Sequence, residues 1–119
     1  IYQAINDKDI TIYGDGTQTR SFSYIDDTIK GIVKILNYES PEVFNIGNDE
    51  EVTIKNLAKK IISLTDSKSK IKYLDLPLDD PKQRKPDLSK AEKLLNYTPS
   101  ITLDEGLKKT IDWFLRYYK

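Results

Sequence analysis

The sequence predicts an α/β fold built from short strands and about four to five helices. Short segments that alternate apolar and polar residues, such as 10–13, are typical of half-buried strands. Longer segments carry apolar residues three and four positions apart, which is typical of amphipathic helices. Gly14-Asp15-Gly16 and the Pro-containing stretch 77–86 separate these segments as a turn and a loop. The predicted strands are too short to complete a sheet among themselves.

The first forty residues are predicted to contain a second extended segment and a long helix. Residues 20–25 alternate like a strand. Asp26 or Asp27 is expected to cap the helix, because a short carboxylate accepts hydrogen bonds from first-turn N–H groups. The helix should end near Tyr38, since Pro41 cannot continue it. Its predicted apolar stripe consists of Ile29, Ile32, Val33 and Leu36.

The middle of the chain predicts a strand, a helix and another strand. Residues 43–47 form a short apolar run that ends in Gly, which predicts a buried strand. Thr53 is expected to cap the next helix. Residues 71–76 return to strand character, and the polar stretch 77–86 is too rich in Pro and charge to pack internally. The inward face expected for the helix consists of Ile54, Leu57, Ala58, Ile61 and Leu64.

Two further helices are predicted near the end of the chain. Asp87 is expected to cap a short one. Thr102 and Glu105 match a capping box, the strongest helix-start signal in the sequence. The apolar positions are Leu88, Ala91, Leu94 and Leu95 in the short helix, and Leu103, Leu107, Ile111, Phe114, Leu115 and Tyr118 in the last one.

The composition excludes several classes of function. Nineteen basic residues balance nineteen acidic ones, which argues against a nucleic-acid binder. With no Cys and no His, Ser-His and Cys-His nucleophiles are excluded within this chain, and disulfides and thiolate metal sites with them. Asp79 and Asp80 are adjacent acids that could contribute to a metal site, but with no His and no third acid nearby no metal site is expected. No membrane-spanning run or signal peptide is recognised, and a soluble cytoplasmic protein is expected.

Three arginines stand out among sixteen lysines. Arg116 lies on the last predicted helix and is interpreted as a surface charge. Arg20 and Arg84 lie in loops or at strand edges beside turn-forming residues. Because the planar guanidinium binds phosphate or carboxylate oxygens in pairs, both are candidate anion ligands. From the residues alone, incidental surface arginines or ion-pair partners are an equally good interpretation.

Three segments resemble the extended short-chain dehydrogenase/reductase family of nucleotide-sugar enzymes. They are YGDGTQTRSFSYIDD at 13–27, FNIGN at 44–48 and DPKQRKPD at 80–87. The third resembles the UDP-glucuronate decarboxylase branch in particular. The resemblance covers essentially all 119 residues.

The resemblance implies that the chain is the C-terminal, substrate-binding portion of an extended Rossmann-type enzyme. In that family an N-terminal Rossmann domain binds NAD and supplies a Tyr-x-x-x-Lys pair. No Tyr here has a Lys four positions on, and no Gly-x-x-Gly-x-x-Gly occurs. A start at Ile1 without any Met, and a helix-like 1–5, also suggest a fragment. We therefore expect 1–119 to be inactive alone and to need its own N-terminal domain, in a parent that is expected to be a homodimer.

The resemblance also implies roles for individual residues. In the decarboxylase branch, NAD oxidises C4 of UDP-glucuronate, carbon dioxide is lost, and the retained NADH reduces the ketone to UDP-xylose. Arg20 matches a family Arg in the sugar pocket and would stabilise charge during decarboxylation. Arg84 matches an Arg that contacts the diphosphate or ribose, and Tyr13 and Gln18 match positions lining the nucleotide pocket. A dTDP-glucose 4,6-dehydratase, a nucleotide-sugar 4-epimerase and a stand-alone binding module remain as alternatives.

Overall fold

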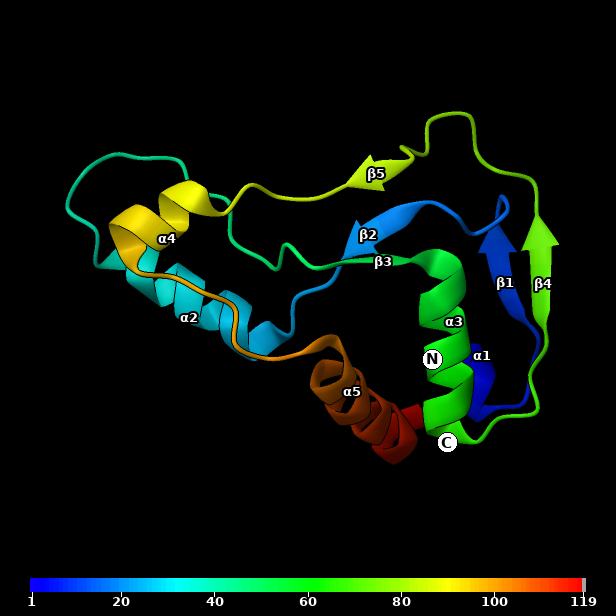
Figure 1. Cartoon of the computed structure of the whole chain (residues 1–119). Helices are drawn as coiled ribbons and strands as arrows, with labels where there is room; N and C mark the ends of the chain where they lie inside the picture. The colour runs from blue at the N-terminus through cyan, green and yellow to red at the C-terminus, as the bar shows by residue number, and fades with distance from the viewer. Residues whose placement is uncertain (119) are drawn as a thin grey trace. The chain divides into compact units, whose positions relative to one another are not determined.

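A computed structural model describes residues 1–118, which divide into two compact units. Unit 1 comprises Ile1–Arg20, Val52–Gln83 and the chain from Leu107 on. Unit 2 comprises Ser21–Glu51 and Arg84–Gly106. Five helices and five short strands occur among the described residues, as the α/β prediction requires (Figure 1). No described helix is long and apolar enough to cross a membrane.

Unit 1 is organised around a two-stranded parallel sheet. Strand β1 (Ile10–Tyr13) pairs with β4 (Ile71–Leu74), in a register that places Ile10 opposite Ile71 (Figure 1). Helices α1 (Tyr2–Ile5) and α3 (Ile54–Thr65) pack beside this sheet, and most of α5 (Leu103–Tyr118) belongs to the same unit. The core residues are Ala4, Ile5, Ile10, Ile12, Ala58, Ile61, Leu107 and Ile111.

The predicted starts of α3 and α5 are confirmed. The hydroxyl of Thr53 accepts a hydrogen bond from the Asn56 N–H at 3.1 Å and so satisfies a first-turn donor. At α5, Glu105 accepts from the N–H and the hydroxyl of Thr102, while Thr102 accepts from the Glu105 N–H at 3.3 Å. This reciprocal pair is the capping box that the sequence predicts.

Unit 2 packs α2 (Ile25–Leu36) with α4 (Ser89–Leu95). The fully buried cluster is Leu88, Ala91, Leu95 and Tyr97, and Ile35, Tyr38, Phe44 and Ile46 pack against it. Gly31 lies on the buried side of α2, where a Cβ atom would meet Ile46 Cγ2 at 2.5 Å and Tyr97 Cε2 at 3.0 Å. This close approach explains a glycine inside a helix.

Three strands form a second sheet in the order β3-β2-β5. Strand β2 spans Thr19–Ser21, β3 spans Glu51–Thr53 and β5 spans Gln83–Arg84. The extended segment predicted at 20–25 is therefore shorter than expected, because Ile25 already begins α2. The loop predicted at 77–86 contains β5.

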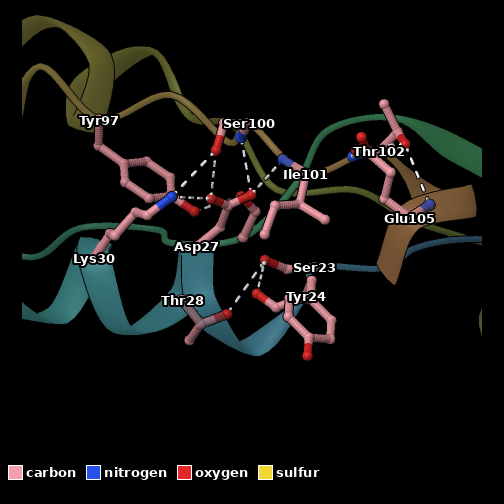
Figure 2. Close-up of polar contacts among 11 residues, drawn as sticks. Ser23, Tyr24, Asp27, Thr28, Lys30, Tyr97, Ser100, Ile101, Thr102 and Glu105 are labelled. Carbon is pink, nitrogen blue, oxygen red and sulfur yellow. Dashed lines mark hydrogen bonds and ion pairs between the residues drawn. The ribbon is translucent and has the colours of Figure 1, made fainter. Parts of the chain in front are cut away.

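The predicted capping of α2 is wrong. The residue that precedes the helix is Tyr24, without a side-chain cap, and Asp26 and Asp27 lie in the first turn. Asp27 is only 1% exposed and accepts hydrogen bonds from the Ser100 N–H and Ile101 N–H, each at 2.8 Å (Figure 2). Its other donors are the Ser100 hydroxyl at 2.9 Å and the Lys30 ammonium at 3.2 Å. Ser100 and Ile101 lie more than seventy residues along the chain, and Lys30 lies on the next turn of α2. A capping rule based on neighbouring residues does not predict such partners.

One other prediction fails in unit 2, and the predicted stripe of α2 is more exposed than a core-facing stripe would be. Residues 43–47 form no strand, and Val43 is 85% exposed. The apolar stripe of α2 does not face the described core: Ile29, Val33 and Leu36 are 51%, 49% and 78% exposed. The stripe is real as a sequence pattern, but the buried side of the helix carries Asp27 and Gly31 instead.

Candidate functional site

A tight turn between β1 and β2 holds two of the predicted ligand residues. Gly14 and Gly16 have φ angles of +71° and +76°, the left-handed region that only Gly adopts freely. The amide Nε2 of Gln18 donates to the carbonyl of Tyr13 at 2.7 Å and closes the turn. Gln18 is consequently buried, whereas the Tyr13 side chain is 52% exposed. Gln18 therefore shapes the turn, and Tyr13 presents an accessible aromatic face.

Main-chain hydrogen bonds from the first turn of α3 hold this turn in place. The Ile54 N–H donates to the Gln18 carbonyl and the Lys55 N–H donates to the Gly16 carbonyl, each at 3.0 Å. Helix N-termini leave such N–H groups without partners inside the helix. A Cβ atom on Gly16 would lie 3.0 Å from Lys55 Cβ, so this close packing also requires Gly.

Beside the turn lies a cavity of about 490 Å³ in unit 1. At its edge Asp15 accepts from the Thr17 hydroxyl at 2.7 Å and from the Thr17 N–H at 2.9 Å. These two hydrogen bonds, the hydroxyl first, hold the pKa of the Asp15 carboxyl below its usual value. The lining residues are Asp15, Thr17, Gln18, Leu76, Asp80 and Lys82.

Arg20 lies on β2 with its guanidinium held at two points. Nη1 donates to the carbonyl of Thr19 at 2.7 Å, and Nη2 forms an ion pair with Oδ1 of Asp80. The two side chains are 16% and 30% exposed, so solvent screens this pair less than an open surface pair. Arg20 is thus an ion-pair partner, the alternative that the sequence left open, and its guanidinium has a defined orientation in unit 1; anion binding by Arg20 stays a prediction.

Arg84 lies on β5 in unit 2, and its side chain is exposed. Its main-chain carbonyl accepts a hydrogen bond from the Ser21 hydroxyl at 3.4 Å. This hydrogen bond restrains the backbone of Arg84, while its guanidinium faces solvent.

Of the four predicted site residues, three lie in unit 1. Gln18 and Tyr13 meet through a hydrogen bond, and Arg20 follows two residues later on β2. Sequence reasoning misses Asp80 as the partner of Arg20, because an Asp-Asp pair in a loop indicates at most a metal ligand. An acid in a loop that returns to an Arg-bearing strand is a signal for an ion pair, but the return itself is visible only in the fold.

Residues 1–110 match the sequence profile described as GDP-mannose 4,6 dehydratase. The chain belongs to this family. It is 44% identical over 116 residues to UDP-glucuronic acid decarboxylase 1 of Danio rerio, a match that covers 98% of this chain and 28% of that protein. Identity to UDP-glucuronic acid decarboxylase 1 of Arabidopsis thaliana is 40% over 114 residues, covering 96% of this chain and 26% of the relative.

Solved structures of the epimerase branch share the fold. UDP-glucuronic acid 4-epimerase from Bacillus cereus, in complex with UDP-glucuronic acid and NAD, is 38% identical with a TM-score of 0.92. UDP-glucose 4-epimerase from Thermotoga maritima, with UDP-glucose, is 27% identical with a TM-score of 0.94. The two matches cover 98% and 99% of this chain and 38% of each solved chain. The resemblance to nucleotide-sugar enzymes is thus confirmed, and the family members of known structure are about two and a half times as long.

Proposed function

We propose that this chain is the C-terminal UDP-sugar-binding part of an NAD-dependent UDP-glucuronate decarboxylase. The observation that carries the proposal is the identity of 44% to such a decarboxylase, spread over 98% of the chain. In this account the chain is inactive alone, because the remaining parts of a longer protein supply the cofactor and the acid–base pair. A cytoplasmic location and a homodimeric parent stay predictions.

Two arginines give the chain its proposed role in binding. A guanidinium is always charged at physiological pH and donates several N–H bonds in one plane, which suits diphosphate and carboxylate oxygens. Arg84 has an exposed side chain on an anchored backbone, and we assign it to the nucleotide diphosphate. Arg20 is more enclosed and rigidly oriented, and we assign it to the charge that develops on the sugar. Tyr13 and Gln18 would line the nucleotide pocket.

NAD is not assigned to the residues of this chain. The cradle for a dinucleotide requires a Gly-rich turn that leads into a helix, and the glycines here do not have that spacing. The turn at Gly14 and Gly16 is instead occupied by the carbonyl contacts to α3. When bound elsewhere in the longer protein, NAD would supply hydride transfer at C4. The residues of this chain would bind, orient and stabilise charge.

The exposed apolar face of α2 suggests that another part of the protein covers it. Ile25, Ile29 and Val33 are about half exposed, and Leu36 is 78% exposed, on one side of one helix. A contiguous apolar stripe of this kind normally marks an interface. We assign its partner to the part of the longer protein that precedes this chain, since the relatives extend to three or four times its length. This stripe also argues against a stand-alone binding module.

A UDP-glucuronate 4-epimerase is the second candidate. It is favoured by the TM-score of 0.92 and 38% identity to the Bacillus cereus enzyme. Both reactions begin from the same substrate, so binding alone cannot separate them.

Product analysis tests the proposal. The longer protein is incubated with UDP-glucuronate and NAD, and the products are identified by NMR. Formation of UDP-xylose with release of carbon dioxide is expected. A product that keeps the carboxylate and inverts C4 would assign the chain to the epimerase, and an unchanged substrate would refute both.

A further inference from the structure

The loop that carries Asp80 is built to hold this residue in place. Proline restricts its own φ and the backbone of the residue before it, so Pro77 and Pro81 restrict both ends of the loop. The Asp80 N–H donates to the Pro77 carbonyl at 3.3 Å. One residue after Pro81, the Lys82 carbonyl accepts from the Thr19 N–H at 2.9 Å. Asp80 is thus held beside Arg20 by a short, restrained segment.

The two contacts orient Arg20 and leave most of its hydrogen-bond donors available. A guanidinium has five N–H donors, and the two observed contacts use one on Nη1 and one on Nη2. One acceptor is a main-chain oxygen and the other a side-chain oxygen, so two separate contacts fix the plane of the guanidinium. Up to three donors remain for a bound anion.

We propose that Asp80 is a positioning residue for Arg20: it sets the orientation in which Arg20 meets the reacting sugar. The inference rests on the proposed function, because it concerns the same site. Electrostatic stabilisation requires donors that already point to where charge will develop, since a flexible arginine must reorient at the moment of reaction. Asp80 supplies that fixed orientation from a neighbouring loop and need not touch the substrate.

A different role for the pair predicts the opposite result. If Asp80 merely competes with anionic ligands for Arg20, its removal raises the local positive charge and tightens ligand binding. If it positions Arg20, its removal leaves binding nearly intact and slows turnover. The two roles therefore separate in kcat and in the dissociation constant for UDP.

The test uses Asp80→Asn in the longer protein, with Asp79→Asn as the matched control. Asp79 is the exposed neighbour in the same loop and carries the same charge, and the described contacts of Arg20 do not include it. Asp80→Asn should lower kcat by about 10- to 100-fold, the size expected for a displaced catalytic group. The UDP dissociation constant should change by less than about threefold, and Asp80→Glu should recover part of kcat, as a restored ion pair requires.

Three results would overturn the inference. They are tighter UDP binding with unchanged kcat in Asp80→Asn, equal behaviour of Asp80→Asn and Asp79→Asn, and a parallel loss of kcat, binding and melting temperature. Wild-type protein that neither binds UDP nor consumes UDP-glucuronate would instead refute the proposed function. That outcome is read from the wild type alone, so the two failures are distinguishable.

Discussion

The carboxylate of Asp27 joins the first turn of α2 to the loop that precedes α5. Burial alone would raise its pKa, but the N–H groups of Ile101 and Ser100, the Ser100 hydroxyl and the Lys30 ammonium outweigh burial. The net pKa is lowered from 3.8 to about 2. Figure 2 shows the donors converging on this one carboxylate from two segments. A single ionised side chain thereby connects the first turn of α2 to the segment that leads into α5.

This network predicts an acid-sensitive stability. Because the folded-state pKa lies below the unfolded value, the ionised Asp27 stabilises the fold fully above about pH 4. This stabilisation should be lost as the pH falls from about 4 to about 2, and it amounts to about 2 kcal/mol. Urea unfolding of the longer protein, followed across this pH range, measures the change in the free energy of unfolding.

Asp27→Asn is the matched control for that titration. The amide is nearly isosteric but cannot ionise, and its NH₂ group can face the N–H donors of the loop. We expect a loss of about 1–3 kcal/mol at neutral pH and a flatter acid profile than in the wild type. An acid profile identical to that of the wild type would remove Asp27 from the explanation.

Helix starts are predicted best from the sequence where the capping residue and its partner are close neighbours in the chain. Thr53 and the Thr102–Glu105 pair cap their helices as predicted, because the donors and acceptors lie within three residues. The prediction fails at Asp27, where a partner more than seventy residues away decides that the acid does not cap α2. It also fails at 43–47, which forms no strand. The same limit applies to Arg20. Its residue type indicates an anionic partner, but that partner lies sixty residues away in the sequence.

Gly31 gives a test of packing between α2 and its neighbours. Ala normally improves a helix interior by about 1 kcal/mol relative to Gly. Here the new methyl group would collide with Ile46 and Tyr97. Gly31→Ala should therefore lower the free energy of unfolding by about 1–3 kcal/mol, as overpacking does.

Thermal and urea denaturation of Gly31→Ala can be compared with Lys59→Ala on the exposed face of α3. The control adds the same residue type to a helix without a packing conflict. A Gly31→Ala protein as stable as the wild type, or more stable, would show that the contact relaxes without cost.

At the scale of the whole molecule, the chain spans 28% of the Danio rerio relative, and α2 exposes an apolar stripe. The sequence pattern indicates the stripe but not what covers it. In our proposal, the covering residues lie outside these 119 positions. In that proposal, residues of the longer protein cover this stripe and complete the core.

Substitution in the stripe tests this dependence. Val33→Lys should lower the stability of the longer protein by at least about 1.5–3 kcal/mol, the free energy gained by burying an aliphatic side chain. Leu78→Lys is the control, because Leu78 is fully exposed in the loop after β4. Equal melting temperatures for both variants would mean that the α2 stripe faces solvent in the longer protein as well.

The central claim, that these residues form the UDP-sugar-binding part of the enzyme, is tested most directly by calorimetric titration of the longer protein with UDP. The wild type should bind UDP, and Arg84→Ala should weaken binding by about 1.5–3 kcal/mol, the value of a hydrogen bond to a charged group. Arg116→Ala, on the last helix, should leave the dissociation constant unchanged. Absence of UDP binding by the wild type, or equal affinity in the wild type and Arg84→Ala, would contradict the account.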